Sequence, residues 1–124
     1  KPVVTDFVNL GGIPEGEALI LAAAAETGSE HPLARAVVEK GKEKNLNLPD
    51  VKNFMAVSGK GIRATIEGRE VMIGNLKLME EFGIEIGAQD AAVEKLQNEA
   101  KTVVYMTVAG KIQALIAMAD TLKP

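Results

Sequence analysis

This chain of 124 residues contains no cysteine and no tryptophan, and His31 is its single histidine. Without cysteine it can form neither a disulfide nor a thiolate metal site, and the composition fits a cytosolic setting. One histidine cannot make a multi-histidine metal site. Aromatic residues make up only 3% of the sequence, so few rings are available for stacking on nucleic-acid bases. We therefore expect no metal site within this chain.

The sequence also lacks a basic block and a long hydrophobic run. Its net charge is −3, and acidic and basic residues are mixed along the chain, which argues against a nucleic-acid partner. The apolar run from Ala18 to Ala25 is far shorter than the roughly 20 residues that a membrane span needs. The length suits one domain. Because the chain begins with Lys1 rather than methionine, we expect a segment of a longer polypeptide. We expect this segment to be a monomer that does not itself enter the membrane.

Hydrophobic periodicity and turn residues predict about four helices and six strands. Glu67-Gly68 and Ala109-Gly110 are hairpin signals, and strands joined by short turns pair antiparallel. The predicted class is therefore α+β: a single domain with a roughly six-stranded, largely antiparallel twisted sheet flanked by about four helices. Residues 83–87 are a short loop or strand. The helices are expected over 14–26, 32–44, 75–82 and 90–100, and the strands over 3–8, 51–57, 62–66, 70–73, 102–108 and 112–118.

The segment around His31 contains the first candidate site residues. Glu30 and His31 precede Pro32, which opens a predicted helix, and a helix start exposes backbone N–H groups. Such a place can hold a small planar ligand. The alternative is that Ser29 caps the helix and His31 is only an exposed neighbour of that cap.

Two glycine motifs follow. Gly59-Lys60-Gly61 lacks the spacing of a P-loop and leads into a strand, so it cannot offer a phosphate the N-terminus of a helix. Its glycines permit close approach of a flat ligand, or else they form a bend or bulge between strands. Gly74-Asn75 lies at a strand-to-helix junction, where Asn75 either caps the helix or orients a neighbouring side chain or ligand.

No self-sufficient catalytic group is evident in the sequence. Neither Ser29 nor Ser58 lies in a nucleophile elbow. Glu80-Glu81 is a carboxylate pair on a predicted exposed helix face, which indicates a solvated surface. We predict no catalytic residue in this chain.

Three motifs together carry a resemblance to a known family. The Ser29–Leu33 segment, Gly59-Lys60-Gly61-Ile62 and Gly74-Asn75 resemble, in order and spacing, the nucleotide-binding domain of P1B heavy-metal-transporting P-type ATPases, the class that includes the copper pumps. The resemblance extends to the segments at both ends, residues 1–5 and 119–124. It implies that residues 1–124 form a nucleotide-binding domain inserted between two halves of a phosphorylation domain.

The resemblance implies a role for each motif residue at the adenine end of ATP. In the family, the glutamate of the Glu-His pair accepts a hydrogen bond from the adenine amino group, which points to Glu30. The family's histidine packs on the purine, which points to His31. A purine can stack on an imidazole, and a carboxylate can accept from an amino group.

The glycine motifs complete the expected pocket. By the same resemblance, Gly59 and Gly61 line the adenine and ribose, and Ile62 forms an apolar wall. Gly74 leaves space, and Asn75 steadies the Glu-His segment or the ligand. Lys60 is not part of the family pattern; it could screen phosphates, although an ordinary surface lysine is the simpler interpretation.

The resemblance also implies partners that lie outside this chain. Phosphoryl transfer needs an acceptor and metal-binding carboxylates, and the family places these aspartates before Lys1 and after Pro124. We therefore expect binding of ATP or ADP, with Mg²⁺ carried by the phosphates, and no turnover by the segment alone. Its protein partners would be the phosphorylation and actuator domains of a copper pump, at the cytoplasmic face of a membrane. The alternatives are a ligand-free regulatory or protein-interaction domain and a stand-alone phosphohydrolase.

Overall fold

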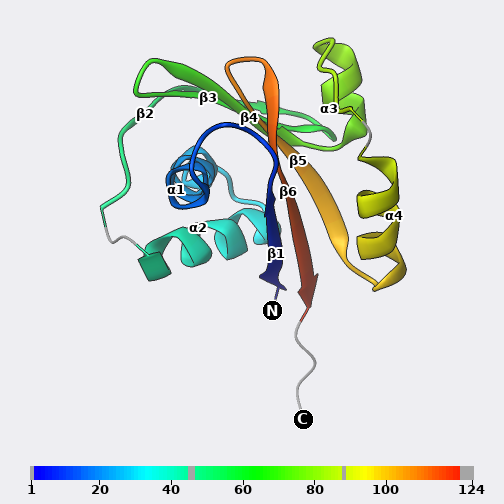
Figure 1. Cartoon of the computed structure of the whole chain (residues 1–124). Helices are drawn as coiled ribbons and strands as arrows, with labels where there is room; N and C mark the ends of the chain where they lie inside the picture. The colour runs from blue at the N-terminus through cyan, green and yellow to red at the C-terminus, as the bar shows by residue number, and fades with distance from the viewer. Residues whose placement is uncertain (1, 45–46, 88, 121–124) are drawn as a thin grey trace.

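A computed structural model describes residues 2–44, 47–87 and 89–120 of the chain. Six strands form one sheet in the order β1-β6-β5-β4-β3-β2, and every pair of neighbours is antiparallel (Figure 1). This confirms the predicted class. In chain order the elements are β1 (Pro2–Asn9), α1 (Glu15–Glu26), α2 (Pro32–Lys44), β2 (Val51–Val57), β3 (Gly61–Ile66), β4 (Arg69–Gly74), α3 (Leu76–Glu81), α4 (Asp90–Asn98), β5 (Thr102–Val108) and β6 (Lys111–Asp120).

Helices cover both faces of the sheet, α1 and α2 on one side and α3 and α4 on the other (Figure 1). Side chains alternate along a strand, so each central strand supplies both cores. In β4, Val71 and Ile73 pack with α1 and α2, whereas Met72 packs with α3 and α4. α1 is apolar nearly all round, as its Ala-Leu-Ile content predicts, and Ala18, Leu19 and 21–26 are buried.

The first and last strands of the sequence lie beside each other. β1 pairs with β6 from Pro2–Asp120 to Asn9–Ala114. The described chain therefore enters and leaves the fold at one place. Lys1 and the segment from Thr121 to Pro124, which contributed to the resemblance at the two ends, lie outside the described residues.

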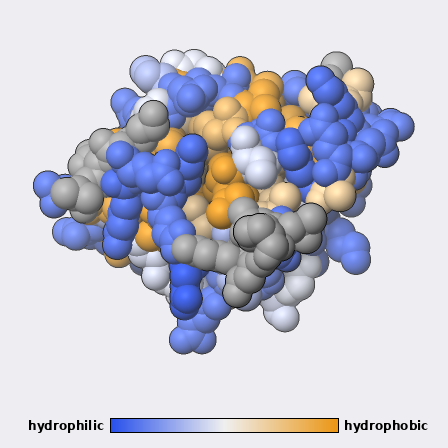
Figure 2. All heavy atoms as spheres, turned by 90° about the horizontal axis from the view of Figure 1, so that it is seen from below, coloured by the Kyte–Doolittle hydropathy of each residue, from blue (hydrophilic) through white to orange (hydrophobic). Residues whose placement is uncertain are grey.

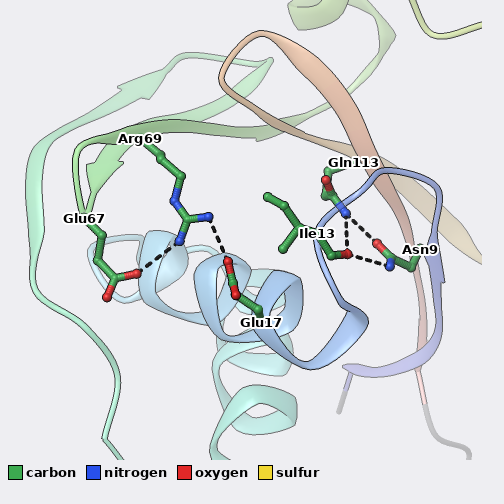
Figure 3. A network of polar contacts seen from close by, with 6 residues as sticks. All are labelled: Asn9, Ile13, Glu17, Glu67, Arg69 and Gln113. Carbon is green, nitrogen blue, oxygen red and sulfur yellow. Dashed lines mark hydrogen bonds and ion pairs between the residues drawn. The ribbon is translucent and has the colours of Figure 1, made fainter.

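The loop between β1 and α1 is held by Gln113 of β6. The Gln113 carbonyl oxygen accepts hydrogen bonds from the N–H groups of Leu10 and Gly11. Its side-chain amide donates to Asn9 Oδ1 at 2.6 Å and to the Ile13 carbonyl at 3.1 Å (Figure 3). This network fixes the point at which α1 begins.

Of the two alternatives for residues 83–87, the structure shows no strand at 84–86. The boundary of α4 differs from the prediction, because this helix ends at Asn98 rather than Ala100. Ala100 adopts a φ of +62°, a left-handed conformation that a helix cannot continue through.

Among the described residues, Met55 and Leu76 are the large hydrophobic side chains that are exposed, at 54% and 43%. Figure 2 shows one face with hydrophilic side chains around most of its rim and hydrophobic residues near its centre. Among the described residues, none of the helices has both the length and the apolar character required to span a membrane.

Candidate functional site

The two glycine motifs meet at the ends of β3 and β4. Gly61 and Gly74 are direct register partners across these strands. A Cβ on Gly61 would overlap the carbonyl oxygen of Ile73, and a Cβ on Gly74 would overlap that of Lys60. Gly61 also has a φ of +153°. The close approach of two backbones therefore requires both glycines, which supports the bend interpretation; a pocket-lining function for them stays a prediction.

Asn75 joins the glycine motifs to α3. Its Oδ1 accepts from the Leu78 N–H at 3.1 Å, so the predicted helix cap is confirmed. Its Nδ2 donates to the Gly59 carbonyl at 2.9 Å, and its backbone N–H donates to the Lys60 carbonyl at 2.9 Å. Both ends of the amide are thus engaged by protein, and Asn75 positions the glycine turn, which we define as residues 58–61.

Two other residues of this region differ in environment: Lys60 lies at the surface and Ile62 in the core. The Lys60 ammonium forms an ion pair with Glu81 at the end of α3, so its charge is already neutralised. Ile62 is only 5% exposed and packs in the core with α1 and α2. Lys60 therefore fastens the glycine turn to α3, in agreement with its interpretation as a surface lysine.

His31, rather than Ser29, caps α2. The ring Nδ1 accepts from the Leu33 N–H at 3.2 Å, and the Ser29 hydroxyl accepts instead from the His31 N–H at 3.3 Å. The alternative in which Ser29 caps the helix is wrong, because the imidazole is closer to the first free N–H after Pro32. With Nδ1 as an acceptor, the neutral ring carries its proton on Nε2, and the side chain is exposed. Residues 28–31 are termed the histidine turn below.

The carboxylate before His31 and the one at the end of α1 differ sharply in environment. Glu30 is exposed. Glu26 is 8% exposed, and burial raises the pKa of its carboxyl from an ordinary value near 4.5 to about 7. Among the described residues its side chain has no hydrogen-bond or ion-pair partner. Perturbed, unpaired carboxyls are typical of functional sites, so Glu26 is a candidate that our sequence reasoning missed. A signal was present: a carboxylate within a helix that is apolar nearly all round.

α1 brings the histidine turn toward the glycine end of the sheet. At its start, Glu17 pairs with Arg69 at 2.8 Å, beside the β3–β4 turn (Figure 3). α1 contacts β3 and β4, and just after its end a Cβ on Gly28 would lie 3.0 Å from the ring of Phe54 in β2. The helix therefore runs from the β3–β4 turn toward the end of these strands that bears Gly61 and Gly74. Within the described residues, no hydrogen bond or ion pair connects the two turns directly.

A surface hollow lies at the opposite end of α1 and is a poor alternative site. The hollow contains one basic side chain, Arg69, but Glu17 and Glu67 pair with its guanidinium and raise its pKa (Figure 3). The hollow is lined by Glu17, Ile20, Leu21, Asn47, Leu48, Pro49, Glu67 and Arg69.

In ranges 2–44, 47–87 and 89–120, no group of three or more His, Asp or Glu side chains is arranged to hold a metal ion.

A family model and curated relatives both match nearly the whole length of this chain. The sequence model of the haloacid dehalogenase-like hydrolases matches residues 1–124. A copper-exporting P-type ATPase of Bacillus subtilis (strain 168) is 43% identical over 123 residues, which is 99% of this chain and 15% of that protein. The chain thus spans only a small part of the length of this curated relative.

Two solved structures share the fold. A zinc-transporting PIB-type ATPase matches with a TM-score of 0.86 and 33% identity, over 99% of this chain and 20% of that one. The N-domain of HMA8, a copper-transporting P-type ATPase, matches with a TM-score of 0.74 and 32% identity, over 94% of this chain and 99% of that one. The homologues are metal-transporting P-type ATPases, and because the family model covers its whole length, the chain belongs to the haloacid dehalogenase-like hydrolase family.

Proposed function

We propose that this chain is the nucleotide-binding domain of a heavy-metal-transporting P-type ATPase, with copper as the transported metal. It binds the adenine moiety of ATP and presents the γ-phosphate to an aspartate on a separate phosphorylation domain. The observation that carries this proposal is the likeness to the N-domain of HMA8, which extends over 99% of that chain at 32% identity. The curated relatives include ATPases named as copper-exporting, and these names support copper as the transported metal.

The pairing of β1 with β6 supports an inserted domain. Pro2 and Asp120 are register partners. Insertion of one domain into a loop of another requires two connections that lie close together. Residues 1–124 can therefore interrupt a phosphorylation domain without separating its two halves. The partners on this proposal are the phosphorylation and actuator domains of the same parent protein, at the cytoplasmic face of a membrane.

The two turns offer complementary groups to adenine. The exposed His31 ring, fixed through Nδ1, can stack on the purine. A carboxylate must then accept from the amino group, and we assign this contact to Glu26, because a ligand N–H would give its buried carboxyl the partner it lacks. Glu30, which the family resemblance indicated, is the alternative acceptor. Gly59, Gly61, Ile62, Gly74 and Asn75 remain proposed as the other side of the pocket.

On this proposal, the chain contributes few charged groups to the binding of the ATP phosphates. Lys60, the cation of the glycine turn, is paired with Glu81. Mg²⁺ would therefore be held by the phosphates, and transfer would need groups from another domain. Stacking and a few hydrogen bonds supply roughly −8 to −4 kcal/mol, a micromolar-to-millimolar dissociation constant.

Titration of the isotopically labelled domain with ATP, AMP and GTP, followed by NMR, tests the proposal. We expect chemical-shift changes at both turns, similar for ATP and AMP and weak for GTP. No change at millimolar nucleotide would overturn the proposal and favour a ligand-free regulatory or protein-interaction domain.

The matched pair Glu26→Gln and Glu30→Gln identifies the adenine acceptor. We expect Glu26→Gln to weaken AMP binding about tenfold, as a lost charge-assisted hydrogen bond would, and Glu30→Gln to leave it nearly unchanged. The reverse order of effects would return the contact to Glu30.

A further inference from the structure

We propose that Phe54 is a positioning residue that couples the histidine turn to the glycine turn. This inference rests on the proposed nucleotide site and adds a residue that none of its motifs contains. The two turns come from distant parts of the sequence, and within the described residues no polar contact joins them. Phe54 lies against Gly28 of the first turn and belongs to β2, the strand that leads into the second.

The first contact of Phe54 is with the histidine turn. A Cβ on Gly28 would lie 3.0 Å from Cγ and Cδ1 of the ring and 3.2 Å from Cδ2. These distances are tighter than ordinary van der Waals contact, so the ring fills the space that a larger residue at 28 would need. Gly28 is three residues before His31, and the ring therefore limits how far the histidine turn can move toward the sheet.

A bulge in β2 directs the ring to this position. Val51 and Phe54 are three residues apart, and a regular strand would place them on opposite faces. Asn53 instead has a φ of +54°, and the β2–β3 register shifts between Lys52 and Met55. Both Val51 and Phe54 consequently pack with the core of α1 and α2.

The second connection of Phe54 is along its own strand to the glycine turn. Three residues after Phe54, Val57 pairs with Gly61, and its carbonyl accepts from the Lys60 N–H at 2.9 Å. Val57 packs against the other core, with α3 and α4. β2 is thus held on one face at Phe54 and on the other at Val57, so a shift of the ring is transmitted to residues 58–61.

Three variants test this coupling: Phe54→Leu, Gly28→Ala and their combination, with Met55→Ala as the control. Met55 is adjacent but 54% exposed. We expect Phe54→Leu and Gly28→Ala each to weaken AMP binding about tenfold, and the double variant to regain part of the loss because the smaller residue makes room for the added Cβ. Met55→Ala should bind as the unmodified domain does.

The dissociation constant separates positioning from mere stability. It is measured well below the melting temperature, where a destabilised but folded variant binds normally. Variants that melt lower yet bind AMP with unchanged affinity would overturn the coupling, as would losses that simply add in the double variant. If the unmodified domain binds no AMP, the proposed function fails instead, so the two failures are distinguishable.

Discussion

Individual glycines in this domain meet very different constraints. Gly61 and Gly74 face each other where two backbones nearly touch, whereas Gly12 is exposed and a Cβ there would have open space. The composition gives twelve glycines but does not show which of them the fold requires. The register of β3 against β4 reveals that the fold needs Gly61 and Gly74.

Gly61→Ala should therefore destabilise the domain by about 2 kcal/mol or more, because the Cβ overlaps a backbone carbonyl and φ is positive. Gly12→Ala should change the unfolding free energy by no more than about 0.5 kcal/mol. Urea denaturation measures both. Equal midpoints for the two variants would contradict the close approach of β3 and β4.

Glu26 should make stability depend on pH. Its folded pKa of about 7 is above its ordinary value near 4.5, so the folded state binds the proton more tightly. The part of the folding stability that depends on Glu26 is therefore fully present below about pH 4.5, and it is lost as the pH rises through about 7. Glu26→Gln should flatten this fall, which thermal melts between about pH 5 and 8 will measure, while the exposed Glu30→Gln should follow the unmodified protein. A Glu26→Gln curve parallel to that of the unmodified protein would contradict the burial of this carboxyl.

The candidate site was predictable from sequence only in part. The motifs identified Asn75 as a cap, because its type and its place before a helix suffice for that. They offered Ser29 as the cap of α2, whereas His31 caps it, since an imidazole nitrogen can accept the same kind of hydrogen bond. Glu26 was missed because it is burial that sets this carboxyl apart, and burial depends on how α1 packs.

At the scale of elements, Asn75 connects a helix to a turn through opposite ends of one amide. Asn75→Asp keeps the acceptor for Leu78 but loses the donor to Gly59. We expect it to keep most of the stability, whereas Asn75→Ala should lose about 1 kcal/mol through the missing cap.

Hydrogen exchange gives the second measurement on these variants. Amides of residues 59–61 should exchange faster in both variants than in the unmodified domain, because each loses the bond to the Gly59 carbonyl. Slow, unchanged exchange in Asn75→Asp would show that this bond does not hold the glycine turn.

The elements themselves were largely predictable, because hydrophobic period and turn residues are local. Glu67-Gly68 and Ala109-Gly110 each indicated a hairpin correctly. The bulge at Asn53 was not predicted: asparagine tolerates a left-handed conformation, but nothing local indicates that Val51 and Phe54 share one core.

At the scale of the whole molecule, the sequence pattern could not predict the order of the strands in the sheet. β1 pairs with β6, at the far end of the chain, and not with β2, the next strand in sequence. Either arrangement could bury similar apolar faces. In the sheet, β6, β5, β4 and β3 lie between β1 and β2, which form opposite edges.

A circular permutant tests this topology. Joining the chain ends by a short Gly-Ser linker and opening the chain between Ala109 and Gly110 should preserve a cooperative fold, because the new break lies in an exposed turn. A control permutant opened between Leu115 and Ile116, both fully buried, should not fold. Circular dichroism melts distinguish the two, and two equally unfolded permutants would contradict the pairing of Pro2 with Asp120.

The β1–β6 pair also determines how the domain responds to force. Because Pro2 and Asp120 are partners at the open end of this pair, pulling the chain ends apart would load its hydrogen bonds one after another. The pair would unzip from that end at low force. A host that keeps the two attachment points together puts no load on these bonds, so it can swing the whole domain through large angles while the sheet stays intact.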